Sequence, residues 1–315
     1  MFLATVVGPT GSGKSALALA LAEQFGGEIV NCDSLQLYRG FDIGTAKTTP
    51  GARRGIPHHL FDVLTPQESY SAGEYAREAR KVIAEIAGRG RLPIVVGGTG
   101  FYLRALLEGL PVLPERDDRL RERLLDRERR RPASLHRLLM RMEPGAAARI
   151  HTNDVQKTIR ALEVRLLTRQ ALPPPAEAHA LEGYAVIKLG LDPDRVGLQQ
   201  RLENRTRAMF AHGLLEEVQG LLAAGATGSE KPFEALGYKQ VLLHLRGEIA
   251  LKQAIESTIV ETRQYAKRQR TWFRRDPEIH WLHGYGDDAE ILAQATQADI
   301  SALSSMPPIQ SQQNP

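Results

Sequence analysis

Short apolar runs alternate along the chain with longer segments of helical composition. The apolar, β-branched runs predict buried strands at residues 2–7, 28–32, 92–96 and 184–189, with a possible last strand at 279–282. Strong helix formers or helical periodicity predict helices at 16–22, 74–87 and 101–108. The alternation predicts an α/β fold, in which helices flank a parallel sheet.

The composition changes near Pro111–Pro114. From residue 116 to about 169 the pattern is helical, rich in arginine and nearly without strand signal, and Pro173–Pro175 closes it. We therefore predict an all-helical domain, residues 115–183, inserted into one catalytic core. The core would comprise 1–114 and 184–300, with further helices near 193–211, 214–224, 232–246 and 248–275. Residues 49–70 are predicted to be a loop, and 301–315, rich in Ser, Pro and Gln, a disordered tail.

The first predicted strand leads into a glycine-rich loop followed by a helix. Its residues are Gly8, Pro9, Thr10, Gly11, Ser12, Gly13, Lys14 and Ser15. This is the P-loop pattern, in which backbone N–H groups and a helix N-terminus surround phosphate oxygens. Lys14 adds a point charge, and the Ser15 hydroxyl can ligate Mg²⁺. The loop predicts a polyphosphate ligand without saying which one.

Asp33 is the nearest carboxylate at the end of a predicted strand, because the strand 92–96 is followed by Gly97-Gly98-Thr99-Gly100. The strand, this glycine segment and the helix that follows form a second strand–glycine–helix unit, which could bind an anion. We expect Asp33 either to help bind a metal ion or to serve as a general base for an acceptor substrate. It could instead be a turn-forming aspartate that only binds a local backbone N–H.

The net charge of the 315-residue chain is +4, and basic charge is concentrated in two segments. Residues 115–170 hold 15 Lys and Arg against 9 Asp and Glu, and residues 261–275 hold 6 against 1. This distribution fits a nucleic-acid binder, and equally two solvated arginine-rich helices.

The single cysteine, Cys32, excludes a disulfide framework and indicates a reducing compartment. We expect Cys32 to be a buried small residue, and His58 and His59 to have a structural or substrate-loop role rather than a metal. No apolar run approaches the roughly 20 residues of a membrane helix. A strand that begins at residue 2 leaves no room for a signal peptide, so we expect a cytoplasmic protein without a membrane contact.

Several motifs occur in a fixed order that identifies a family. They are the P-loop, Asp33-Ser34 with Ile43-Gly44-Thr45-Ala46-Lys47, Pro57-His58-His59-Leu60, Val96-Gly97-Gly98-Thr99-Gly100, Asn153-Asp154 with Arg160-Ala161-Leu162-Glu163, Leu236-Gly237-Tyr238-Lys239-Gln240, and Lys267 to Arg274. From residue 2 to about 283 the chain resembles the bacterial tRNA dimethylallyltransferase, or isopentenyltransferase, family. The P-loop alone is weak evidence, whereas the second and last motifs are highly specific.

The resemblance implies a P-loop NTPase-like fold and transfer of a dimethylallyl group from its diphosphate to N6 of adenosine 37, beside the tRNA anticodon. Residues 8–15 would hold the departing diphosphate, with Mg²⁺ at Ser15. Asp33 would be the general base, Thr99 would donate to the oxygen that links allyl and phosphate, and Arg205 would stabilise the leaving group. Arg207 is a close rival of Arg205. The partners would be tRNA and dimethylallyl diphosphate, and the protein would be monomeric.

The resemblance also implies which residues contact tRNA. Those near the extruded base would be Asp33, Ser34, Leu35, Gln36, Thr99, Leu236, Gly237, Tyr238, Lys239 and Gln240. Those in the insertion, which would close over the anticodon arm, would be Arg121, Gln156, Lys157, Thr158, Ile159 and Arg160. Those gripping the backbone would be Lys267, Arg268, Gln269, Arg270, Thr271, Trp272, Phe273 and Arg274. Lys157 departs from the expected arginine, which puts a bidentate phosphate contact there in doubt.

Three other functions remain open at this point. A small-molecule P-loop kinase would need a metal carboxylate as well as a lid. An adenylate isopentenyltransferase would not need two basic segments. A non-enzymatic RNA-binding protein would leave the P-loop and Asp33 without a purpose.

Overall fold

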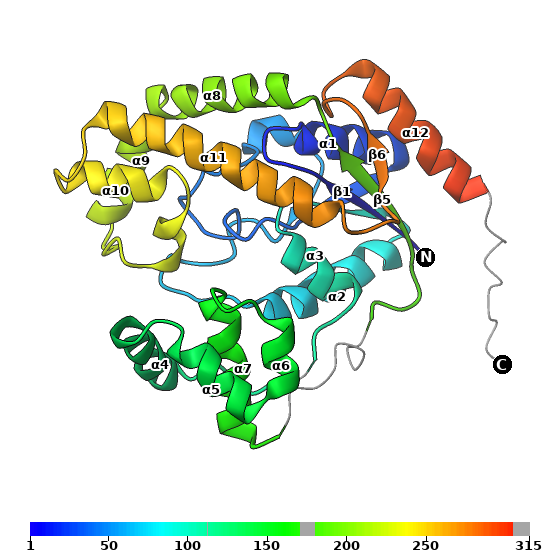
Figure 1. Ribbon diagram of the computed structural model, residues 1–315. Coiled ribbons are helices and arrows are strands. Elements are labelled where there is room, and N and C mark those ends of the chain that lie inside the picture. The colour runs from blue at the N-terminus through cyan, green and yellow to red at the C-terminus, as the bar shows by residue number, and fades with distance from the viewer. Residues whose placement is uncertain (112, 171–179, 305–315) are drawn as a thin grey trace. The chain divides into compact units, whose positions relative to one another are not determined.

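The computed structural model describes residues 1–111, 113–170 and 180–304 (Figure 1). They form two compact units. The larger unit comprises Met1–Leu107 and the chain from Leu181 onward, and the smaller comprises Glu108–Ala180. The predicted closing prolines Pro173–Pro175 lie outside the described residues. The two units are described separately below.

The larger unit is built on a parallel sheet, as predicted, and the sheet has six strands. Its strands are β1 (Phe2–Val7), β2 (Gly27–Asn31), β3 (His58–His59), β4 (Leu92–Val96), β5 (Ala185–Leu191) and β6 (His280–Leu282). They lie in the order β3-β2-β4-β1-β5-β6. Ala4 of β1 pairs with Ile94 on one side and Ile187 on the other. β1 is therefore central, and the loop that follows it starts in the middle of the carboxyl edge of the sheet, where open α/β folds bind ligands.

Helices flank the sheet, and Figure 1 shows α1 (Lys14–Phe25) and α2 (Ala72–Gly88) on opposite sides of β1 and β5. Side chains of a strand alternate between its two faces. Ala4 and Val6 accordingly pack with α1 in a core that also includes Ile291 of α12 (Ala289–Ser304). α2 buries Tyr75, Ala79 and Ile83 and packs against β2, β4 and α3 (Gly100–Leu107).

A second group of helices follows β5. It contains α8 (Arg195–Ala211), α9 (Leu214–Ala223), the 3-10 turn η3 (Lys231–Glu234), α10 (Tyr238–Leu245) and α11 (Leu251–Phe273). α11 packs against α8, α10 and α3. It therefore connects the late helices to the glycine segment that follows β4 (Figure 1).

The structure corrects three local predictions. The expected loop 49–70 contains η1 (Pro50–Arg53) and the edge strand β3, which is too short to give a periodic signal. The helix expected at 232–246 is interrupted, because Ala235 takes an extended conformation between η3 and α10. Residues 301–304 of the expected disordered tail belong to α12, and 305–315 lie outside the described residues.

The smaller unit is all-helical. It contains α4 (Asp118–Arg130), α5 (Ser134–Met142), α6 (Pro144–Arg149) and α7 (Val155–Thr168). Leu124, Leu135, Leu139 and Leu162 pack in its own core, while Arg123, Arg127, Arg129 and Arg130 of α4 are exposed. Within the described residues of the whole chain, no helix combines the length and apolar character needed to cross a membrane.

Candidate active site

The P-loop lies between β1 and α1 and packs against α8. A Cβ added at Gly11, whose φ is +81°, would lie 2.7 Å from Cδ2 of Leu202 on α8, so this close approach requires glycine. Lys14 turns back over the loop, and its Nζ donates a hydrogen bond to the Pro9 carbonyl at 2.9 Å. The Ser12 hydroxyl is buried and has no hydrogen-bond partner among the residues that the structure describes. The loop thus offers a polar, tightly packed cradle of the kind that holds phosphates.

Arg205 on α8 supplies a second cation to the loop. Its Nη2 donates to the Thr10 hydroxyl at 2.7 Å. Burial lowers the pKa of Arg205, and the neighbouring charge of Arg201 lowers it further. Arg207, the rival from the sequence, instead lies on an exposed face and pairs with Glu203 at 2.9 Å. The structure therefore brings Arg205, and not Arg207, to the P-loop.

The pKa of Lys14 is also changed by burial and by neighbouring charges. Burial lowers the pKa of Lys14 from 10.5 to about 8; the Asp33 carboxylate opposes this shift and the Arg205 guanidinium adds to it. Two cations close together at the P-loop attract a multiply charged anion.

Asp33 follows β2 at the same edge of the sheet. One carboxylate oxygen, Oδ1, accepts a hydrogen bond from the Leu35 backbone N–H at 2.9 Å, as a turn-forming aspartate would. The backbone N–H of Asp33 donates to Asn31 Oδ1 at 2.8 Å, which fixes the turn. In the described part of the chain Oδ2 forms no hydrogen bond, so that oxygen remains able to accept a proton from a ligand.

Thr99 lies beside Asp33 in the segment that begins α3. Its hydroxyl accepts from the Ser34 backbone N–H at 3.1 Å, and its backbone carbonyl accepts from Tyr102 N at 2.9 Å. The side chain is thus held at the turn after β2 rather than used to cap α3. Its hydroxyl hydrogen has only a 3.4 Å contact with Ser34 Oγ and can turn to a ligand oxygen.

The P-loop, the turn after β2, the glycine segment after β4 and helix α8 all contribute to one cavity of about 550 Å³, formed within the larger unit. Thr10, Asp33, Thr99 and Arg205 form a polar part of the wall. Much of the remaining lining is apolar or aromatic and includes Leu35, Tyr38, Phe101, Tyr102, Met209, Phe210, Leu214 and Leu236. A cavity with a few convergent polar groups and an apolar wall suits a ligand that carries both an anionic head and a hydrocarbon part.

The predicted Leu236–Gln240 segment divides between wall and core. Leu236 and Gly237 line the cavity, and Lys239 is exposed. Tyr238 and Gln240 are buried, and Gln240 Oε1 accepts from the Gly237 N–H at 2.9 Å. Any contribution of Tyr238 and Gln240 to tRNA binding is therefore indirect in this structure.

Glu217 on α9 holds one rim of the cavity and was missed by the sequence analysis. Its Oε2 accepts from the Ile43 backbone N–H at 2.8 Å, and its Oε1 accepts from the Tyr238 hydroxyl. Gly44 N donates to that same hydroxyl at 3.1 Å. Lys47 is also structural, since its buried Nζ pairs with Asp42 and Asp62 at 2.6 Å each. No local signal marks Glu217, because its partners are distant in sequence.

The basic segment at the end of α11 separates into free and paired cations. Arg270 and Arg274 both pair with the largely buried Asp192, which follows β5. Lys267 and Arg268 are exposed and have no ion pair within the described residues. Phe273 and Gln269 are buried.

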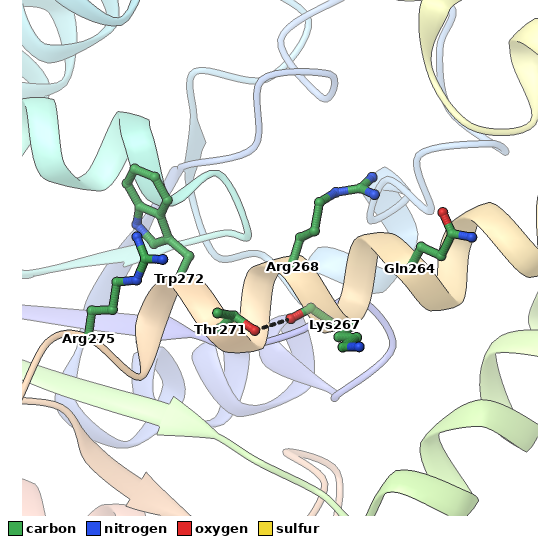
Figure 2. A pocket seen from close by; sticks show the side chains of 6 residues that line it. All are labelled: Gln264, Lys267, Arg268, Thr271, Trp272 and Arg275. Atoms are coloured by element: carbon green, nitrogen blue, oxygen red, sulfur yellow. Dashed lines mark hydrogen bonds between the residues drawn. The ribbon is translucent and has the colours of Figure 1, made fainter. Parts of the chain in front are cut away.

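The exposed residues line a groove of about 450 Å³. Figure 2 shows six side chains of α11 and the residues just after it around this groove. They are Gln264, Lys267, Arg268, Thr271, Trp272 and Arg275. Trp272 is 37% exposed, and Arg268 lines both the groove and the cavity. Free cations next to an exposed aromatic ring are typical of a nucleic-acid surface.

In the smaller unit, the two predicted arginines surround a buried carboxylate. Arg121 donates two hydrogen bonds to Glu163, at 2.9 and 2.8 Å, and Arg160 donates one at 2.6 Å. Burial alone would raise the pKa of Glu163, but hydrogen bonds from the two arginines outweigh it and lower the pKa to about 2. Both arginines thus stabilise this unit. Gln156 and Lys157 are exposed, with Lys157 paired to Asp154, whereas Thr158 and Ile159 are buried.

The two histidines that could suggest a metal site, His58 and His59, each contact an oxygen atom of the protein. His59 Nε2 lies 2.7 Å from Glu28 Oε2, and His58 Nδ1 lies 2.8 Å from the Ile56 carbonyl oxygen. Cys32 is buried as expected, and burial raises the pKa of its thiol to about 12. Across residues 1–111, 113–170 and 180–304, no three His, Cys, Asp or Glu side chains are grouped so that they could hold a metal ion.

Comparison with known proteins identifies the family. The sequence profile described as IPP transferase matches residues 36–276. The chain is 58% identical over 296 residues to the tRNA dimethylallyltransferase of Solibacter usitatus (strain Ellin6076), covering 92% of this chain and 95% of that protein. It is 54% identical to the tRNA dimethylallyltransferase of Koribacter versatilis (strain Ellin345), with 94% and 97% covered.

Solved structures agree with this assignment. The tRNA isopentenylpyrophosphate transferase of Bacillus halodurans superposes with a TM-score of 0.73 at 35% identity, covering 96% of this chain and 97% of that one. A eukaryotic dimethylallyltransferase described as acting on tRNA superposes with a TM-score of 0.77 at 29% identity, covering 99% and 82%. The chain belongs to the tRNA dimethylallyltransferase family of IPP transferases.

Proposed function

We propose that the chain transfers a dimethylallyl group from dimethylallyl diphosphate to N6 of adenosine 37 of tRNA, and that it releases diphosphate. The observation that carries this proposal is a single cavity in which Thr10 of the P-loop, the Arg205 guanidinium and the strand-end carboxylate of Asp33 meet an apolar wall. The relatives named tRNA dimethylallyltransferase support the reaction class.

In the proposed reaction, N6 attacks the allylic carbon that carries the diphosphate. A C–N bond forms, the C–O bond to the diphosphate breaks, and both electrons of that bond leave with the diphosphate. Lys14 and Arg205 stabilise the negative charge that grows on the departing oxygens, which lowers the barrier more than it favours substrate binding. Thr99 donates its hydroxyl hydrogen to the bridging oxygen, and Asp33 Oδ2 accepts the proton of N6.

We propose that Mg²⁺ accompanies the diphosphate. The Ser15 hydroxyl is exposed in the first turn of α1, directly after the P-loop cradle. One hydroxyl fits an ion that takes its other ligands from substrate phosphates and water, as protein-bound Mg²⁺ commonly does. When bound, the ion would neutralise charge on the leaving diphosphate.

The acceptor adenosine must leave its stack to reach the cavity. The groove on α11 supports this step, because Arg268 lines both the groove and the cavity. Lys267 and Arg268 would hold phosphates of the tRNA, while Leu35 and Leu236 would contact the extruded base. The monomeric state and the cytoplasmic location expected from the sequence stay predictions.

The proposal is tested by incubating the protein and Mg²⁺ with labelled dimethylallyl diphosphate and either tRNA or AMP, or with labelled ATP. We expect label in tRNA alone, and loss of transfer when the acceptor carries guanosine at position 37. Label in AMP would indicate an adenylate isopentenyltransferase, and phosphate transfer from ATP would indicate a kinase; either result would contradict the proposal.

A further inference from the structure

The side-chain amide of Gln269 joins two loops at the cavity. Gln269 lies on α11 and is only 6% exposed. Its Oε1 accepts a hydrogen bond from the Thr10 backbone N–H at 2.8 Å, and its Nε2 donates to the Gly98 carbonyl at 2.9 Å. A side-chain amide has an acceptor oxygen at one end and an NH2 group with two donors at the other, and both ends are used here.

Each loop carries a different group of the candidate active site. Thr10 lies in the P-loop, and its hydroxyl accepts from Arg205. Gly98 directly precedes Thr99, whose hydroxyl lies at the cavity. The Gln269 amide therefore sets the spacing between two groups. One is the P-loop with Arg205, which would face the leaving diphosphate, and the other is the Thr99 hydroxyl, which would face the bridging oxygen of the diphosphate.

The packing around Gly98 shows that this spacing is tight. A Cβ added at Gly98 would lie 2.1 Å from Nε2 of Gln269, which is closer than any side chain allows. α11 thus approaches the segment after β4 along a path that only glycine permits. Small errors in the placement of reacting groups have large effects on rate.

We propose that Gln269 is a positioning residue, which holds the P-loop and the Gly98–Thr99 segment at the spacing that transfer requires. This inference rests on the proposed function for its effect on turnover. It replaces the direct tRNA contact expected for Gln269 from the sequence, because the side chain is buried and both ends of its amide are engaged within the protein.

The experiment uses Gln269→Met, a neutral side chain of similar length that removes both hydrogen bonds. We expect the affinity for inorganic pyrophosphate, measured by calorimetry with Mg²⁺, to fall at least fivefold. We expect kcat of tRNA prenylation to fall at least tenfold, while KM for tRNA stays within twofold. A second variant, Gln269→Glu, keeps the acceptor for Thr10 but loses the donor to Gly98, and should also lower kcat at least tenfold.

Glu28→Gln is the matched control. Glu28 is a buried polar residue near the start of β2, at the opposite edge of the sheet, and pairs with His59 and Arg89. The Glu28→Gln variant should have a lower melting temperature than wild type and an unchanged affinity for pyrophosphate. Three results would overturn the positioning role. The first is an equal loss of pyrophosphate affinity in the Glu28→Gln control, and the second is a pyrophosphate affinity of Gln269→Met within twofold of wild type. The third is failure of both Gln269 variants to fold. A wild-type protein that binds pyrophosphate without prenylating tRNA would overturn the proposed function alone.

Discussion

Arg205 donates a hydrogen bond to the Thr10 hydroxyl at 2.7 Å across 195 positions of sequence. This contact connects α8, which follows the inserted unit, to the loop that follows the first strand. It places the guanidinium at the edge of the P-loop, where a bound diphosphate would lie. It also distinguishes Arg205 from Arg207, which the sequence left as alternatives.

Arg205→Gln should lower kcat of prenyl transfer by about 10²–10³-fold, because one charged donor to the leaving group is lost. KM for tRNA should change little, since the residue faces the donor. Steady-state kinetics with tRNA and dimethylallyl diphosphate measure both constants. Arg207→Gln is the matched control and should keep turnover within a few-fold of wild type. Equal losses in the two variants would contradict the assignment.

Asp33→Asn should lower kcat by about 10²–10⁴-fold, because asparagine cannot accept the N6 proton. The variant retains an oxygen for the Leu35 N–H, so the turn and the tRNA affinity should stay near normal. Single-turnover transfer and a tRNA filter-binding assay separate the two effects. Glu78→Gln controls for the loss of one charge, since Glu78 lies on α2 in a partly exposed pair with Lys81. Turnover of Asp33→Asn within a few-fold of wild type would remove Asp33 as the base.

Donor binding should depend on the protonation of Lys14, whose pKa is lowered to about 8 by burial. The charged form exists below this pKa, and the neutral form above it binds an anion weakly. The affinity for dimethylallyl diphosphate, measured by calorimetry without tRNA, should therefore fall as the pH rises through about 8. Bound diphosphate would raise the pKa of Lys14, so the affinity should begin to fall near pH 8 and level off above the higher pKa of the complex. Lys14→Arg should flatten the profile, and an equally steep fall in that variant would contradict Lys14 as its cause.

Lys267→Ala and Arg268→Ala should each weaken tRNA binding and reduce the slope of log affinity against log salt by about one. Both cations are exposed and have no ion pair within the described residues, so they are available to phosphates. Arg274→Ala is the matched control, because its guanidinium is paired with Asp192 at 2.6 Å. That variant should lose stability and keep the slope. An unchanged slope for Lys267→Ala and Arg268→Ala would exclude the groove on α11 from the interface.

Glu163→Leu should destabilise the helical unit by about 3 kcal/mol or more, because Arg121 and Arg160 lose their buried partner. The pKa of Glu163 is lowered to about 2 in the folded protein, against 4.5 as its ordinary value. Its stabilising contribution is therefore complete above about pH 4.5 and is lost as the pH falls toward 2.

Hydrogen exchange of residues 113–170 as a function of pH tests this expectation. In the wild-type protein, amide protection from exchange should be lost as the pH falls from about 4.5 toward 2. In Glu163→Leu, amide protection should be reduced already at neutral pH. Asp118→Asn removes an exposed pair with Arg116 and serves as the control. Equal protection in wild type and Glu163→Leu would show that the buried pairs add no net stability.

The sequence was sufficient wherever a feature depends on neighbouring residues. The P-loop, the strand-end position of Asp33 and the glycine segment before Thr99 are short patterns, because each reflects the backbone conformation of a few consecutive residues. The apolar runs likewise predicted the parallel sheet. The two-residue strand β3 was missed, because a strand of that length is formed by pairing with β2 and has no periodicity of its own.

The sequence by itself determined the family and the parallel α/β class of the fold. Only the tertiary structure decided which charged and polar groups are free to act. Arg205 and Arg207 have the same charge, as do Arg268 and Arg274, yet in each pair one cation is available at the cavity or groove while the other is bound in an ion pair. Hydrogen bonds and Coulomb forces depend on distance in space, and the partners that set them can be far apart along the chain, as Gln269 and Thr10 are at a separation of 259 positions.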